Sequence, residues 1–111
     1  MNMRIWIDDV RPAPEGYIWC KSTNEAKNVI TCAMQMLRIE NTANIPVIEL
    51  IDIDHDAGDQ ARWGGDYIQV MHWLEKQCYH YPFVFRIHSM NPVGAQNMRW
   101  IIERNNWKEI V

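Results

Sequence analysis

The 111-residue chain is poor in cysteine and has no pattern that would pair its thiols. Three cysteines occur, Cys20, Cys32 and Cys78, so their number is odd, their spacings are wide, and no C-x-x-C sequence is present. This pattern argues against a disulfide framework, a thiolate metal site and a redox-active pair. We expect all three to be reduced thiols in the core of a cytoplasmic protein.

Positive charge and long apolar runs are also scarce. The formal net charge is −3, which gives no basic footprint for extended duplex nucleic acid, although a nucleotide or an RNA end stays compatible with local charge. No apolar stretch approaches the ~20 residues that span a bilayer. Residues 1–6 lead straight into a strand-like run without a signal-peptide pattern, so we expect a cytoplasmic chain without membrane contact.

What the chain does have is hydrophobic content, 48% of its residues, which argues against disorder and suits one domain over residues 1–111. Short apolar runs rich in β-formers alternate with longer runs at helical spacing. This alternation predicts an α/β fold in three layers, with a mostly parallel sheet of four to five strands. We expect strands at 3–7, 17–20, 47–53 and 83–88, helices at about 23–39, 67–78 and 92–105, and a strand or docked tail at 107–111.

The segment between the first two strands differs from the others. Residues 8–16 contain Pro12 and Pro14, which exclude a regular helix there. Nine residues are also short for a parallel crossover, which usually takes a dozen or more. The second strand therefore either follows a tight non-helical crossover or lies antiparallel at the edge of the sheet.

Carboxylates cluster where two apolar runs end. Asp8 and Asp9 directly follow the run 3–7, and Asp54 and Asp56 follow the run 47–53. In an open α/β sheet the carboxyl ends of parallel strands line the ligand crevice. Adjacent acids repel unless a cation compensates them, and Mg²⁺ or Mn²⁺ takes carboxylate oxygens. We therefore expect these acids to share a divalent cation.

Simpler roles for the acids compete with this interpretation. Asp8 and Asp9 would also suit a turn or a cap, with Arg4 or Arg11 compensating their charge. Asp52, one pleat from the following acids, suits a buried, hydrogen-bonded carboxyl group.

Histidines and small polar residues complete the pattern. His55 lies between two aspartates and could orient a carboxylate, bind a metal or transfer a proton. His88 and Ser89 close the run 83–87, and Asn91-Pro92 predicts the start of a helix. A helix N-terminus suits phosphate, so Ser89 or Asn91 could bind a phosphoryl oxygen in addition to capping the helix. Arg11 could contact the same phosphate from its loop.

The order of these motifs resembles the receiver domain of bacterial response regulators, where an acidic pair, a phosphoacceptor aspartate and a Ser or Thr follow successive strands. Asp8, Asp9, Asp54 and Ser89 match that order. The chain is more closely similar to a small receiver-like group proposed to process cyclic phosphates. That group's motifs Asp-Asp-x-Arg-Pro, Asp-His-Asp and His-Ser-x-Asn-Pro begin here at Asp8, Asp54 and His88. The resemblance implies a flavodoxin-like fold, shortened where a loop replaces the helix between the first two strands.

This resemblance implies metal-assisted phosphoester chemistry, such as hydrolysis or processing of a cyclic phosphate on a nucleotide or RNA end. We expect an enzyme in which Mg²⁺ or Mn²⁺ polarises a phosphoryl oxygen while two histidines act as base and acid. In a variant route an aspartate attacks the phosphorus. The expected residues are Asp8, Asp9, Asp54 and Asp56 for the metal, His55, His88 and Asp54 for catalysis, and Ser89, Asn91 and Arg11 for phosphate.

Two alternatives remain open. In the first, the chain is a non-enzymatic receiver whose Asp54 accepts a phosphoryl group and alters a protein partner. Against it, signalling receivers have a helix between their first two strands and a lysine after the fifth, whereas Lys108 lies at the start of any such strand. In the second, the chain binds a nucleotide or a protein without turnover.

Overall fold

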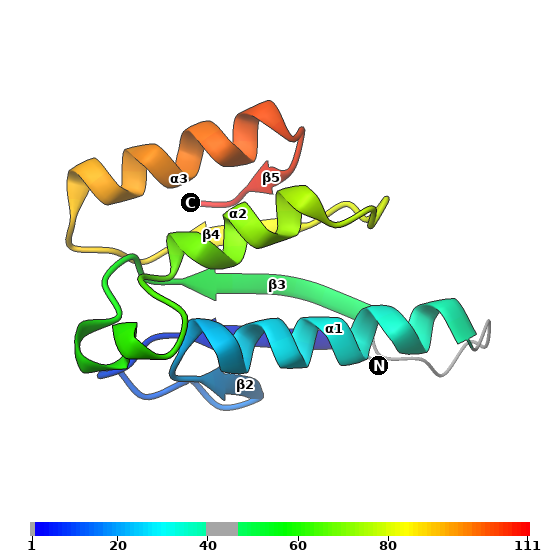
Figure 1. Ribbon diagram of the computed structural model, residues 1–111, viewed down its shortest axis with the longest axis horizontal. Coiled ribbons are helices and arrows are strands. Elements are labelled where there is room, and N and C mark those ends of the chain that lie inside the picture. The colour runs from blue at the N-terminus through cyan, green and yellow to red at the C-terminus, as the bar shows by residue number, and fades with distance from the viewer. Residues whose placement is uncertain (1, 40–46) are drawn as a thin grey trace.

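The computed structural model describes residues 2–39 and 47–111, and these fold around a five-stranded parallel sheet (Figure 1). The strands lie in the order β2-β1-β3-β4-β5, so the sheet has its topological switch at β1 and β3. The strand bounds are Asn2–Ile7 (β1), Tyr17–Cys20 (β2), Val47–Ile53 (β3), Val84–Ile87 (β4) and Lys108–Glu109 (β5). The helices are Thr23–Ile39 (α1), Ile68–Lys76 (α2) and Pro92–Arg104 (α3), with a short 3₁₀ helix at Gly58–Arg62 (η1).

Parallel pairing of β1 with β2 settles the direction of the second strand. Arg4 pairs with Tyr17 and Ile7 with Cys20 in a parallel register, and the amide of Asp8 donates to the carbonyl of Cys20 at 3.2 Å. The proline-bearing loop therefore makes a tight crossover without a helix. The last segment is a strand rather than a docked tail, because β5 pairs parallel with β4.

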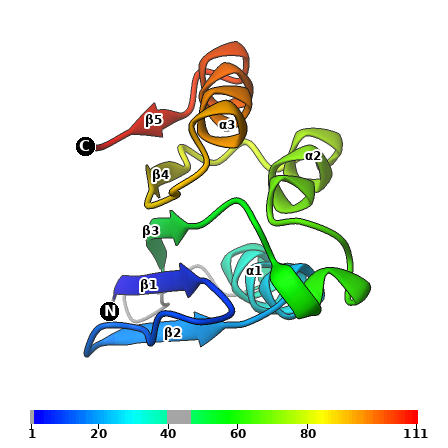
Figure 2. The same ribbon diagram turned by 90° about the vertical axis from the view of Figure 1, so that its left-hand side faces the viewer.

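All three helices lie on one side of the sheet, as Figure 2 shows along the strand order. The expectation of three layers is wrong. The part of the chain that the structure describes forms two layers, one of strands and one of helices. The reason is the loop at 8–16: a crossover from β1 to β2 would carry the helix that covers the other face, and here it has none. The other face of the sheet is called the open face below.

The core lies between the sheet and the helices. Ile5, Ile7, Ile51, Ile53 and Phe85 have no exposed surface and point to the helical side. Burying each such side chain contributes roughly 1.5–3 kcal/mol. Strand alternation then directs their neighbours, including Arg4, Trp6 and Arg86, to the open face.

The three cysteines do not share one environment. Cys20 is buried at the end of β2, whereas Cys32 and Cys78 are exposed, so the expectation of three core thiols is wrong for the latter two. Burial, with a smaller effect of the Glu25 charge, raises the pKa of the Cys20 thiol to about 12.

Side chains cap the starts of two helices. Ser22 Oγ accepts from the amide of Glu25 at 3.1 Å, while the Glu25 carboxylate accepts from the amide of Lys21 rather than that of Ser22. Asn91 Oδ1 accepts from the amide of Gly94 at 2.9 Å, with Pro92 beginning α3. Among the described helices, none combines the length and the apolar character needed to cross a membrane.

Candidate metal and phosphate site

Three carboxylates meet at the carboxyl edge of the sheet. Asp8 and Asp9 follow β1, Asp54 follows β3, and these two strands are hydrogen-bonded neighbours. Asp8, Asp9 and Asp54 each offer an oxygen within 4.8 Å of the others. Asp8 and Asp54 are buried, at 1% and 8% exposure, and Asp9 is partly buried. These oxygens form a hard donor set of the kind that suits Mg²⁺ or Mn²⁺.

Asp8 is the most constrained of the three. Its Oδ1 accepts from the amides of Val10 and Arg11 at 2.9 and 3.1 Å, which makes it the turn-forming residue that the simpler interpretation expected. Its Oδ2 lies 3.0 Å from His88 Nε2 and 3.6 Å from Arg11 Nε. Both roles of Asp8 are therefore compatible, because a turn fixes the carboxylate at the edge where the other acids lie.

Asp9 lies among other negatively charged side chains. Burial raises the pKa of Asp9, and the charges of Asp8, Asp54 and Asp59 raise it further. The backbone of η1 passes close by, since a Cβ on Gly58 would lie 2.6 Å from Asp9 Oδ2 at a positive φ of 55°. Glycine at this position lets the loop close beside Asp9. The excess of negative charge is what a bound cation would relieve.

His88 lies between two buried aspartates. Its Nδ1 is 2.6 Å from Asp52 Oδ1, and its Nε2 is 3.0 Å from Asp8 Oδ2. The indole of Trp6 stacks on the imidazole at 4.0 Å with an interplanar angle of 7°. Both nitrogens are engaged by carboxylates of the chain, so His88 is arranged to hold Asp8 rather than to reach a substrate. Asp52 is the buried, hydrogen-bonded acid that its position in β3 suggested.

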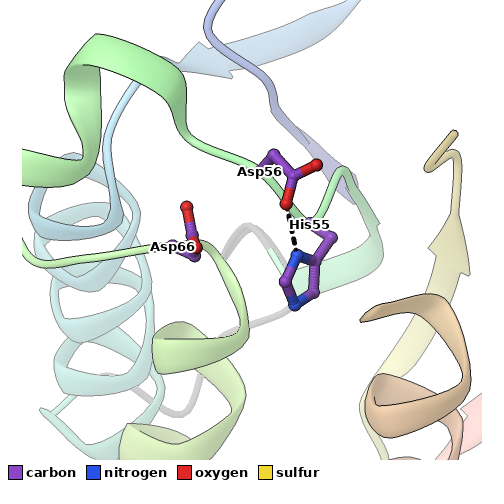
Figure 3. Close-up of side chains that lie close together, drawn as sticks. All are labelled: His55, Asp56 and Asp66. Atoms are coloured by element: carbon purple, nitrogen blue, oxygen red, sulfur yellow. Dashed lines mark hydrogen bonds and ion pairs between the residues drawn. The ribbon is translucent and has the colours of Figure 1, made fainter. Parts of the chain in front are cut away.

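Asp56 does not join the three converging carboxylates. It lies with His55 and Asp66 in a second group whose ligand atoms are within 4.8 Å of one another (Figure 3). Its Oδ1 is 2.7 Å from His55 Nδ1 and accepts from Asn91 Nδ2 at 3.3 Å. The hydrogen bond from His55 is the main cause that lowers the pKa of Asp56, with a further one from Asn91.

His55 is held in place by hydrogen bonds and packing from its neighbours. Its amide donates to Asp54 Oδ1 at 2.7 Å, and its side chain is 14% exposed. The ring packs against α3 at Gly94, where a Cβ would lie 2.4 Å from His55 Cγ. Among the described residues, the Nε2 of His55 has no hydrogen-bond partner, and Figure 3 shows it on the side of the ring away from Asp56.

The residues expected to bind phosphate form hydrogen bonds with backbone groups of the chain. Ser89 Oγ accepts from the amide of Asn91 at 3.0 Å, and Asn91 caps α3, so both side chains serve the turn. Arg11 donates from Nη1 to the carbonyl of His88 at 2.9 Å, and 44% of its side chain is exposed. The guanidinium of Arg11, in the loop after β1, therefore lies beside Asp8 and is partly exposed to solvent.

Sequence reasoning missed several residues that build this edge. Tyr67 is fully buried, and its hydroxyl donates to the carbonyl of Lys21 at 2.6 Å. Burial raises the pKa of Tyr67, and the charges of Asp9, Asp8 and Asp54 raise it further. Asp66 Oδ1 accepts from the amide of Ala57 at 3.0 Å. The glycines before it mark a turn, but no local signal reports the long-range contacts.

Comparison with known protein families places most of the chain in a described family. The family model described as the cyclic-phosphate processing receiver domain matches residues 3–104, which is nearly the whole chain. Searches of curated proteins and of solved structures found no match.

Proposed function

Because the chain belongs to the family of cyclic-phosphate processing receiver domains, with a role related to cyclic phosphate processing, we propose that it hydrolyses a cyclic phosphate with the help of a divalent cation. The observation that carries this proposal is the convergence of Asp8, Asp9 and Asp54 at the carboxyl edge of the sheet. The proposed substrate is a nucleotide or an RNA end that bears the cyclic phosphate.

The three carboxylates would hold Mg²⁺ or Mn²⁺ through oxygen ligands only. A bound cation of this kind supplies Lewis acid chemistry, since it polarises a phosphoryl oxygen and stabilises charge on it. The exposed part of Arg11 would contact a second oxygen of the same phosphate. His88 is a positioning residue in this account, because it links the buried Asp52 to Asp8.

His55 is the proposed general base. Asp56 accepts from Nδ1, which leaves the lone pair of the neutral ring on Nε2. Nε2 would take a proton from water as the water oxygen bonds to phosphorus and one ring P–O bond breaks. The same proton then returns from His55 to the leaving oxygen, so the product is an ordinary phosphomonoester. Asp56 orients the imidazole and stabilises its charged form.

The test is hydrolysis of 2′,3′-cyclic nucleotides in Mg²⁺ or Mn²⁺, followed by phosphorus NMR. We expect turnover that EDTA abolishes and that His55→Ala lowers strongly. The matched control is His80→Ala, because His80 is an exposed histidine away from this edge. Unchanged turnover in His55→Ala would remove the general base from the proposal.

Asp54 at the end of β3 also favours a second candidate function, a phosphoacceptor of the receiver type. Incubation with acetyl phosphate and Mg²⁺, read by intact mass, would detect a stable adduct. Lys108 gives no support to this candidate, since its partner Val84 lies at the far end of β4 from His88. An adduct lost in Asp54→Asn, without turnover of cyclic nucleotides, would favour this candidate.

A further inference from the structure

The open face carries aromatic and cationic side chains where a covered sheet would carry aliphatic ones. Arg4, Trp6 and Arg86 point to this side because their neighbours Ile5, Ile7 and Phe85 point into the core. The strand registers pair Arg4 with Tyr17 and Trp6 with Trp19, and Cα partners project to the same side. Figure 2 shows that the described helices all lie on the other side.

A hollow of about 210 Å³ lies in this face between two arginines. Arg4 comes from β1 and Arg86 from β4, and their side chains are 50% and 42% exposed. The remaining lining residues are Tyr17, Glu49, Leu50 and Ile110. The hollow therefore offers an apolar floor with a guanidinium from each of two separated strands.

Three aromatic side chains lie between this hollow and the carboxyl edge or beside it. Tyr17 packs edge-on against Trp6 at 6.0 Å, and Trp6 in turn stacks on His88. Arg4 lies 5.9 Å from the ring centroid of Tyr17, and Lys21 lies 4.6 Å from that of Trp19. Aromatic platforms mixed with arginines and lysines are what single-stranded nucleic acids use, through base stacking and phosphate contacts.

The positive charge of the open face favours an anionic ligand. Lys108 also points to this side, since its partner is Val84, whereas the chain as a whole has a net charge of −3. The nearby acids already form ion pairs. Glu49 pairs with Arg4 at 3.0 Å, and the buried Asp52 lies near Arg86. A second copy packed by a two-fold axis would set these cations against each other. An exposed ion pair such as Arg4–Glu49 is weak, so a phosphate can replace its carboxylate at little cost.

We propose that the open face binds a single-stranded polynucleotide whose end lies at the carboxylate edge. The proposal rests on the proposed function and names its substrate class as an oligonucleotide rather than a free nucleotide. Arg4 and Asp8 are four residues apart along the chain, so the hollow lies roughly 13 Å from the site at a strand rise of about 3.3 Å. A short single strand spans this distance with its bases on the aromatic side chains.

The test measures binding without turnover. A fluorescein-labelled single-stranded RNA of about 6 nucleotides with a 3′-phosphate is titrated by anisotropy in EDTA, at several salt concentrations. The open-face variant is Arg4→Gln with Arg86→Gln. The matched control is Arg38→Gln with Lys76→Gln, because both residues are exposed and lie on α1 and α2. Circular dichroism and thermal unfolding verify that each variant is folded.

We expect the open-face variant to bind about tenfold more weakly and the control variant to bind like the wild type. The slope of log K against log salt should fall by about 1.4 in the open-face variant, at about 0.7 for each lost phosphate contact. Equal weakening in both variants, no binding by the wild type, tighter binding of duplex than of single strands, or a stable dimer that blocks binding would each overturn the proposal. Equal affinity for single-stranded DNA and RNA would support the proposal and would show that the face contacts bases and phosphates rather than the 2′-hydroxyl groups.

The result separates this proposal from the proposed function. Since EDTA removes the cation, RNA binding at the open face is measured even where the carboxylate edge turns over nothing. Conversely, hydrolysis of a cyclic mononucleotide with no RNA binding would leave the proposed function standing and remove the open-face proposal.

Discussion

His55 and His88 both lie at the carboxyl edge of the sheet and both contact carboxylates, but they differ in how many nitrogens are engaged. His88 touches the buried Asp8 and Asp52 with its two nitrogens, and Trp6 covers its ring. His55 touches the exposed Asp56 with Nδ1 alone. A histidine held on both sides stabilises a fixed arrangement of charge, whereas one oriented from a single side keeps a nitrogen for proton transfer.

His55→Ala should reduce kcat for a cyclic nucleotide by about 10²–10⁴-fold, because it removes the proposed general base. Because the imidazole is largely buried against Gly94 on α3, the free energy of unfolding should also fall, by roughly 1–2 kcal/mol. Steady-state kinetics and urea unfolding check both parts. A variant that lost stability and kept its kcat would reverse the roles of the two histidines.

His88→Ala should lower the free energy of unfolding by about 3 kcal/mol, because it leaves the carboxylates of Asp8 and Asp52 buried without their shared partner. His88→Gln, which keeps one donor, should recover part of this loss. Urea unfolding in EDTA is the measurement, so that no cation contributes. Stability equal to the wild type in His88→Ala would show that the two aspartates do not depend on the histidine.

Gly94→Ala should move His55 without touching its own chemistry, since the new Cβ would lie 2.4 Å from His55 Cγ. We expect kcat to fall by about 10²-fold through misplacement of the imidazole, even though alanine favours a helix over glycine by about 1 kcal/mol. The control is Gln96→Ala on the exposed side of α3. Wild-type kinetics in Gly94→Ala would mean that the position of the ring does not matter.

Glu75 provides a compensated carboxylate for comparison with the acids at the site. Hydrogen bonds from Arg104 at 2.7 Å, and then from Asn105, lower the pKa of Glu75 to about 2. A lowered pKa in the folded state gives stability that is present above the unfolded value of 4.5 and is lost as pH falls towards 2. Arg104→Gln should therefore destabilise the protein at pH 7 and have little effect near pH 2, measured by urea unfolding at each pH. A cost independent of pH would point to packing instead of charge.

The ionised carboxylate of Asp9 should lower the stability of the fold, whereas that of Glu75 raises it. Its raised pKa means that the charged carboxylate is less favourable in the folded state, so its destabilising effect appears as pH rises above the ordinary value of 3.8. In EDTA, Asp9→Asn should stabilise the protein at pH 7 and have no effect at low pH. Urea unfolding at both pH values provides the measurement. Destabilisation at pH 7 would show that Asp9 makes a favourable contact in the absence of the cation.

The strands and the edge that carries the acids could be predicted from the sequence, because apolar runs and the positions of their ends are local properties. The two-layer architecture could not, although its cause, the prolines at 12 and 14, was visible. The register of a strand end decides whether Asp52, Asp54 or Asp56 faces a site, and that depends on pairing between β1 and β3. The partners of His88 could not be predicted either, because Asp8 lies 80 residues away along the chain.

The convergence of Asp8, Asp9 and Asp54 on one cation is tested by Mn²⁺ binding to the apo protein, measured by electron paramagnetic resonance or calorimetry. We predict one ion per chain in the wild type, bound much more weakly in Asp9→Asn and in Asp54→Asn, and unaffected in Asp66→Asn. Absence of binding would contradict the claim. So would an ion that persists in Asp9→Asn and is lost in Asp66→Asn, because it would then lie with His55 and Asp56 instead.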